Sequence, residues 1–186
     1  MKLPIYGYGQ DVLRKVGKTI TPDYPQLSQL IADMWETMYN AKGIGLAAPQ
    51  IGRDIRLFVV DTAQLDAEDR PNKEEGIKQV FINAQIIEEA GKEWSYEEGC
   101  LSIPHIRGNV KRLPQIKIEY MDEQFQKHER IFDGLTARVI QHEYDHIEGK
   151  LFVDLLQPLK KMTIKKQLER IKKGKIEVNY RMIFAE

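Results

Sequence analysis

The sequence predicts one domain that mixes α-helices with β-strands, and three features support this prediction. Apolar residues recur at helical spacing over 25–43 and again over 133–152. The stretch 55–61, "IRLFVVD", is short and mostly apolar, as expected for a buried strand. Apolar and polar residues alternate on either side of a turn within 115–132, which is typical of a β-hairpin. A length of 186 residues fits a single domain over the whole chain, 1–186.

The first helix is predicted within "PQLSQLIADMWETMYNAKG", residues 25–43. Pro25 suits the first helical position, and Gly43 suits the end of the helix. Six apolar residues share one face: Leu27, Leu30, Ile31, Met34, Trp35 and Met38. We interpret this stripe as core packing.

The region between the two helices contains the predicted strands and two loops. "GIGLAAPQIG" (43–52) is rich in Gly and Ala and predicts a close-packed loop. The segment 62–78 is polar, aperiodic and long for a loop, and we expect its charges to face solvent. Residues 79–94 supply further strand material, and the turn of the later hairpin is expected near Asp122.

The second helix is predicted within 133–152, with Asp133 capping its start and Gly149 ending it. Four of its residues fall on a single stripe: Leu135, Val139, His142 and His146. The two histidines therefore continue an apolar face, and imidazoles on such a face need partners.

The two histidines belong to an HExxH motif, His142-Glu143-Tyr144-Asp145-His146. Histidines four residues apart on a helix point the same way and can bind one ion, with the intervening Glu143 beside it as a general base. A catalytic site of this kind needs a third protein ligand. No histidine follows His146, and Glu148 lies too close on the same helix, whereas Glu169 and Glu177 lie in dissimilar contexts. Cys100, the only cysteine, could be the third ligand or simply a small buried residue.

Charge and composition exclude several classes of protein. Lys and Arg number 28 and Asp and Glu also number 28, so the net charge gives no sign of a DNA or membrane partner. No apolar run approaches the roughly 18 residues of a membrane-spanning helix. The opening "MKLPIYGYGQ" lacks the apolar core of a signal peptide, and a single cysteine suits a reducing compartment. We therefore expect a cytoplasmic location.

Three stretches together resemble the signature motifs of peptide deformylases, in the same order: "GIGLAAPQIG" (43–52), "EGCLS" (98–102) and "QHEYDH" (141–146). The opening "IYGYGQDVLRKVG" is also similar to that family, so the resemblance covers nearly the whole chain. It implies an α+β fold in which antiparallel β-strands are wrapped around a central HExxH-bearing helix, with an N-terminal helix and a basic C-terminal helix. It also implies removal of the N-formyl group from the formyl-methionine of new bacterial or organellar polypeptides, with release of formate.

The resemblance implies three metal ligands: Cys100, His142 and His146. It implies that Glu143 is the general base and then acid, and that the Gln50 amide and the Leu101 N–H stabilise the developing oxyanion. One thiolate and two imidazoles suit Zn, Fe or Ni. The resemblance points to Fe(II) as the native ion, with Zn, Ni or Co as substitutes.

Further residues are expected around the substrate. The resemblance implies that Ile44 and Gly45 hold the substrate backbone in an extended pose. Leu135 and Val139 could line an apolar slot for the methionine side chain, and Arg107 could meet the substrate peptide.

The remaining charged and histidine residues receive simpler interpretations. Arg112 could pair with Glu98 as a brace behind the site. Arg138 is a charge where the resemblance leads us to expect an apolar residue, and the segment 62–78 is longer than in a compact bacterial member. His105 is a weak competing ligand, and His128 is expected to be exposed.

The segment 158–175, "PLKKMTIKKQLERIKKGK", predicts a basic C-terminal helix, with eight Lys and Arg residues against the single acid Glu169. It could be a solvated helix face, or it could dock on ribosomal RNA near the nascent-chain exit, as the resemblance also implies.

Two rival functions stay open at this point. An HExxH peptidase of another specificity would share the metal but cleave internal amides. A structural zinc site would hold a binding module together, although such sites usually have four protein ligands.

Overall fold

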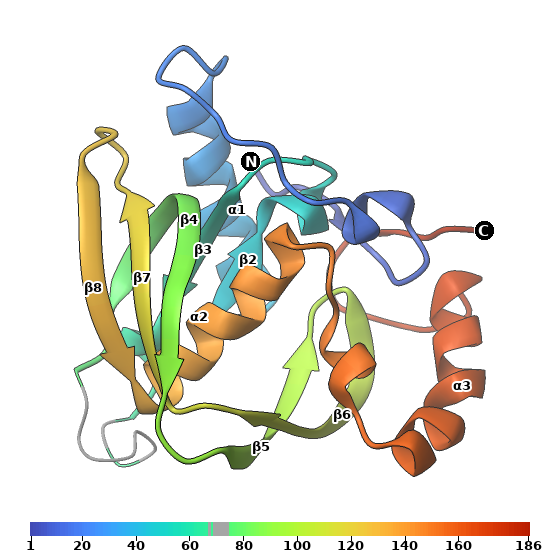
Figure 1. Ribbon diagram of the computed structural model, residues 1–186. Helices are drawn as coiled ribbons and strands as arrows, with labels where there is room; N and C mark the ends of the chain where they lie inside the picture. Colours follow the sequence, from blue (N-terminus) through green and yellow to red (C-terminus); the bar gives the residue numbers. More distant parts are fainter. Residues whose placement is uncertain (67, 69–74) are drawn as a thin grey trace.

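The computed structural model describes residues 1–66, 68 and 75–186 of the chain. The largest sheet among these residues has five strands, and each neighbouring pair is antiparallel. In spatial order the strands are β2 (Gly45–Ala47), β3 (Leu57–Asp61), β4 (Lys78–Ala90), β7 (Gln115–Met121) and β8 (Lys127–Asp133). β2 and β8 are therefore the two edge strands. Figure 1 shows β8 on the outside of the molecule and β2 close to the helix that crosses the sheet.

Helix α2 (Gly134–Ile147) crosses one face of this sheet. It lies between the sheet and a hairpin of two antiparallel strands, β5 (Trp94–Cys100) and β6 (Ile103–Arg112) (Figure 1). Ala137, Ile140 and Ile147 are fully buried and pack with apolar residues of the sheet. Because these residues recur at helical spacing, the helix presents one face to the sheet and leaves another for the hairpin.

The predicted ends of this helix agree with the structure. Asp133 is extended and its carboxylate accepts a hydrogen bond from the Gly134 N–H at 2.8 Å. Gly149, just beyond the last turn, has a φ of 71°, a left-handed conformation that glycine adopts without steric cost. The polar cap and the glycine therefore delimit the helix as the sequence indicated.

Helix α1 (Leu27–Asn40) is shorter than predicted. Pro25 is not the first helical residue, because Gln26 adopts a left-handed conformation with a φ of 53° and the helix begins after it. At the other end the helix stops at Asn40, and the Gly43 N–H returns to the Met38 carbonyl at 2.9 Å. The predicted apolar stripe is confirmed as core packing, with Leu30 and Trp35 only partly buried.

The segment 43–52 is close-packed as predicted, but it is not simply a loop. It contains the edge strand β2 and the 3₁₀ turn η2 (Ala48–Ile51), and all of these residues are buried. The buried strand in 55–61, the strand in 79–94 and the hairpin in 115–132 are confirmed as β3, β4 and β7–β8.

The polar segment 62–78 begins with the 3₁₀ turn η3 (Thr62–Gln64) and reaches β4 at Lys78. The prediction of a long, solvated loop falls largely on residues 67 and 69–74, which lie outside the described residues.

The C-terminal part passes through the 3₁₀ turn η5 (Phe152–Leu155) into α3 (Pro158–Lys172). The basic segment is therefore helical, but the helix ends three residues before the predicted limit of 175. The chain then returns toward the N-terminus, where β9 (Met182–Ile183) pairs in parallel with β1 (Ile5–Tyr6). A 3₁₀ turn, η1 (Asp11–Arg14), follows β1. The two ends of the chain are therefore joined in one small sheet.

Within the described residues, three clusters of buried apolar side chains join these elements. The first packs α1 against the large sheet, the second lies between α2 and that sheet, and the third lies between β6, η5 and α3. The result is a mixed helix-and-sheet fold with three α-helices. In the described part of the chain, every helix is too short or too polar to cross a membrane.

Candidate active site

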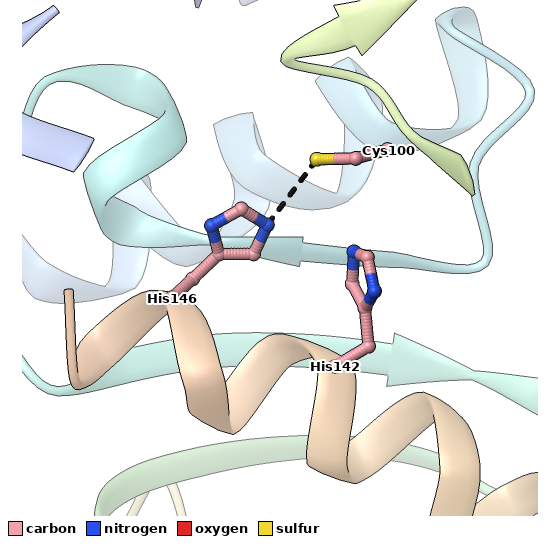
Figure 2. Close-up of side chains that lie close together, drawn as sticks. All are labelled: Cys100, His142 and His146. Carbon is pink, nitrogen blue, oxygen red and sulfur yellow. Dashed lines mark hydrogen bonds between the residues drawn. The ribbon is translucent and has the colours of Figure 1, made fainter. Parts of the chain in front are cut away.

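Cys100, His142 and His146 come together at the end of β5 and along one face of α2. Their candidate ligand atoms lie within 4.8 Å of one another, and the Cys100 Sγ is 3.3 Å from the His146 Nε2. Figure 2 shows both imidazoles rising from α2 toward the sulfur of Cys100. Metal–ligand bonds of about 2.0–2.3 Å place tetrahedral ligands a little over 3 Å apart. The three side chains therefore fit a single metal ion in both chemistry and spacing.

The electrostatic surroundings of these three side chains also favour the binding of a metal cation. Burial lowers the pKa of His146 and so keeps this imidazole neutral, as a metal ligand must be. Burial would also lower the pKa of His142, but hydrogen bonds to Cys100 and Glu98 outweigh it and raise the pKa. The same negative neighbours that attract a proton to His142 would attract a metal ion.

Glu98 organises the groups behind the metal cluster. Its buried carboxylate accepts hydrogen bonds from His142 Nδ1 at 2.9 Å, from Arg112 at 2.7 and 3.0 Å, and from Arg138 at 2.7 Å. Burial raises the pKa of Glu98, yet the hydrogen bonds and charges of His142 and Arg112 more than compensate and hold the pKa below its usual value. Because Nδ1 of His142 is taken by Glu98, its Nε2 is left to bind a metal.

The two arginines around Glu98 have distinct positions. The predicted pairing of Arg112 with Glu98 is confirmed, and Arg112 also donates to Asp145 at 2.8 Å. Arg138 is buried although it contributes to the lining of the cleft, and its guanidinium also donates to the Val110 and Trp94 carbonyls. The positive charge of Arg138 is therefore explained by its pairing with Glu98, which gives this carboxylate a second arginine partner besides Arg112.

Glu143 is a buried carboxylate next to this cluster. It is 4% exposed, and its Oε2 has no hydrogen-bond partner among the described residues. Burial raises the pKa of Glu143 to about 7. A side chain at Gly45 would place its Cβ only 2.5 Å from Glu143 Oε1, so the glycine makes room for this carboxylate.

Gln50 is held beside Cys100 by η2. Its Oε1 accepts a hydrogen bond from the Ala47 N–H at 2.9 Å, which orients the amide so that Nε2 donates toward the Ser102 Oγ at 3.2 Å and the Cys100 Sγ at 3.5 Å. Leu101 lies in the turn that follows β5, and its carbonyl accepts a hydrogen bond from the Tyr180 hydroxyl at 2.8 Å. The Gln50 amide and the Leu101 turn thus both adjoin Cys100.

A cleft of about 790 Å³ runs past these groups. All the residues predicted to contact substrate line it: Ile44, Gly45, Arg107, Leu135 and Val139. The first two are at the edge strand β2, and the last two are buried on α2. Arg107 is exposed and pairs with Glu97 at 2.9 Å.

The other titratable residues considered in the sequence analysis lie outside the cluster of Cys100, His142 and His146. His105 is exposed, and its Nε2 is 2.7 Å from the Glu177 carbonyl rather than in the ligand cluster. Glu148 pairs with Arg56 at 2.6 Å. His128 is only partly exposed, contrary to expectation, because it stacks on Tyr120 and pairs with Asp122.

Residues 2–162 match the family model described as polypeptide deformylase. The chain belongs to this family. A peptide deformylase of Flavobacterium johnsoniae is 58% identical over 190 residues, covering 100% of this chain and 97% of the relative. One from Christiangramia forsetii is 54% identical over 189 residues, covering 99% and 96%. The solved peptide deformylase of Legionella pneumophila superposes with a TM-score of 0.80 at 36% identity, covering 94% of this chain and 98% of that one.

Peptide deformylases remove the N-formyl group from nascent polypeptides, so the predicted function and enzyme class are confirmed. Family membership also decides against the two rival functions left open by the sequence.

Two groups near the deformylase site were not found from the sequence. Ser102 is within the "EGCLS" motif, but only the folded chain shows that its hydroxyl meets Gln50. Tyr180 is far from the motifs, and its contact with Leu101 joins residues 79 positions apart. Neither contact follows from local spacing.

Proposed function

We propose that this chain deformylates formyl-methionyl nascent polypeptides at a metal held by Cys100, His142 and His146. The observation that carries the proposal is the meeting of one thiol and two imidazoles beside the buried carboxylate of Glu143, whose Oε2 has no hydrogen-bond partner in the part of the chain that the structure describes. A divalent ion there would lower the pKa of a coordinated water to about 7 and so provide hydroxide at neutral pH. Fe(II) is the proposed native ion, with Zn, Ni or Co as substitutes, and the donor set is compatible with them.

Glu143 is the proposed general base and acid. It takes the proton of the attacking water and later delivers it to the leaving amine. Its burial supports this role, because a pKa near the working pH allows a carboxyl group both to accept and to release a proton.

Gln50 and Leu101 are proposed to stabilise the oxyanion of the tetrahedral intermediate. The Gln50 amide is oriented by Ala47, and the Leu101 N–H lies in the turn after Cys100. One such donor is typically worth about 10²–10³ in rate, because it is oriented before the charge develops.

The substrate is proposed to lie along β2. Since β2 is an edge strand paired with β3, its other side can accept an extended peptide at Ile44 and Gly45. Leu135 and Val139 supply the apolar slot for methionine, and Arg107 reaches the peptide beyond it. A formyl carbon carries only hydrogen beyond its carbonyl, so a tight site there would reject acetyl groups.

We further infer that α2 is the central helix of a single catalytic domain over 1–186, around which the antiparallel strands are arranged. Its position between the large sheet and the β5–β6 hairpin supports this view. The chain is proposed to act in the cytoplasm, where a thiol ligand stays reduced, and to approach the ribosome through the basic segment 158–175.

The decisive experiment is formate release by protein purified without oxygen. A formyl-Met-Ala-Ser peptide should yield formate, whereas the matching acetyl-Met peptide should not react. Metal analysis of the same sample should give about one ion per chain. An active protein that retains no metal, or that cleaves internal amides instead, would overturn the proposed mechanism.

A further inference from the structure

We propose that Tyr180, in the segment that follows α3, is a positioning residue for the reaction. Its hydroxyl holds the turn that connects Cys100 to Ile103, and through this turn it orients the Leu101 N–H. The inference rests on the proposed function, because the orientation of Leu101 affects the rate only if its N–H stabilises the oxyanion. The matched family model ends at residue 162, so it assigns nothing to this segment.

The geometry begins with the Leu101 carbonyl. The Tyr180 hydroxyl donates to it at 2.8 Å, and the partly buried ring packs, as Leu101 and Met182 do, against the apolar cluster around α1. Burial and the nearby Cys100 both raise the pKa of Tyr180, so the phenol stays protonated and keeps its hydrogen to donate. Tyr180 is therefore a permanent donor at this position.

The turn is held on other sides as well. The Tyr8 N–H donates to the Ser102 carbonyl at 2.9 Å, and the Gln50 amide reaches the Ser102 hydroxyl. The pairing of β5 with β6 shifts register between Gly99 and Cys100, so the strand ladder alone leaves this turn irregular. A separate bond to Leu101 therefore adds a constraint that the ladder does not provide.

The segment that carries Tyr180 is itself fastened at several points. Before Tyr180, the Glu177 carbonyl lies 2.7 Å from His105 Nε2. After it, the Arg181 carbonyl accepts from the Ile5 N–H at 2.8 Å, and β9 pairs with β1. Residues 177–180 line the same cleft as Cys100 and His142. Because the backbone on both sides of Tyr180 is hydrogen-bonded, its hydroxyl has a fixed position and can restrict the movement of the turn after Cys100.

The test replaces Tyr180 with Phe, which keeps the ring and removes the donor. We expect kcat for the formyl-Met peptide to fall about three- to tenfold, the range for losing one neutral hydrogen bond. KM should stay within about twofold, because an oxyanion donor acts in the transition state and not on the bound substrate. Tyr24→Phe, in the segment before α1, is the matched control and should match the wild type in both constants.

Two further readouts separate positioning from loss of structure. Rates are expressed per bound metal, so a variant that only loses metal or folded protein would show an unchanged kcat and would overturn the proposal. Amide hydrogen exchange of a peptide covering residues 99–103 should quicken in Tyr180→Phe and not in Tyr24→Phe. The proposal would also be overturned if exchange in Tyr180→Phe became faster without a fall in kcat, or if neither the exchange rate nor kcat changed. Absence of formate release by the wild type would instead refute the proposed function itself.

Discussion

At the scale of single residues, the role proposed for Glu143, general base and then acid, makes the sharpest prediction. It is buried beside His142 with one carboxylate oxygen unpartnered among the described residues, and Gly45 leaves the space that it occupies. Replacing Glu143 with Gln keeps the shape but removes the ability to take a proton. We expect formate release to fall by about 10²–10⁴ while metal content stays near one ion per chain. Loss of the metal, or survival of most of the rate, would show that Glu143 is not the base.

Cys100 is the residue on which metal binding should depend most. Its sulfur is 3.3 Å from His146 Nε2, and a thiolate donates more charge to an ion than the hydroxyl of serine. Cys100→Ser should therefore lose most of its metal and nearly all formate release while the chain stays folded, as circular dichroism would show. With iron bound, the wild type should also lose activity in air, because an accessible thiolate oxidises. A serine variant with full metal and full turnover would return Cys100 to a purely structural role.

At the scale of elements, Glu98 joins the β5–β6 hairpin to α2. Its carboxylate meets Arg112 of β6 and both Arg138 and His142 of α2, and all four groups are largely buried. Glu98→Ala would leave two buried guanidinium groups without this partner. We expect the free energy of unfolding to fall by about 3 kcal/mol, measured by urea denaturation.

The neighbouring residue offers a matched control for this prediction. Glu97 pairs with Arg107, but both side chains are 60% exposed. Since exposed pairs are worth little, Glu97→Ala should cost less than about 1 kcal/mol. Equal losses at positions 97 and 98 would mean that the buried network does not join the hairpin to the helix.

At the scale of the whole molecule, α3 concentrates positive charge on a chain of net zero. Ile164 and Ile171 fix one side of α3 in the core, whereas Lys161 and Lys165 are exposed. Replacing both lysines with Glu should weaken co-sedimentation with ribosomes severalfold and reduce its dependence on salt, because fewer phosphate contacts are made. Cleavage of a short formyl peptide should be unchanged.

The control for α3 moves the same charge change elsewhere. Lys92→Glu with Lys127→Glu alters net charge equally but lies outside α3. If both double variants weaken ribosome binding alike, overall charge and not α3 would explain the effect. Truncation is a poorer test, because removing α3 also removes β9 and Tyr180.

The sequence predicted the elements whose signals are local. The apolar stripe and Asp133 identified α2, and the alternation in 115–132 identified β7 and β8. It missed the pairing of β5 with β6 and began α1 too early, at Pro25. Neither error is surprising, because Gln26 adopts a left-handed conformation that composition does not encode, and strand pairing depends on distant partners.

By itself, therefore, the sequence determined the placement of His142, Glu143 and His146, because residues three and four positions apart on a helix share a face whatever surrounds it. Only the tertiary structure decided the rest of the site. The contact of Cys100 with His146 spans 46 positions, and that of Tyr180 with Leu101 spans 79. Such contacts depend on how the β5–β6 hairpin and the C-terminal segment pack against α2 and β1, and packing over these separations is a property of the folded chain as a whole.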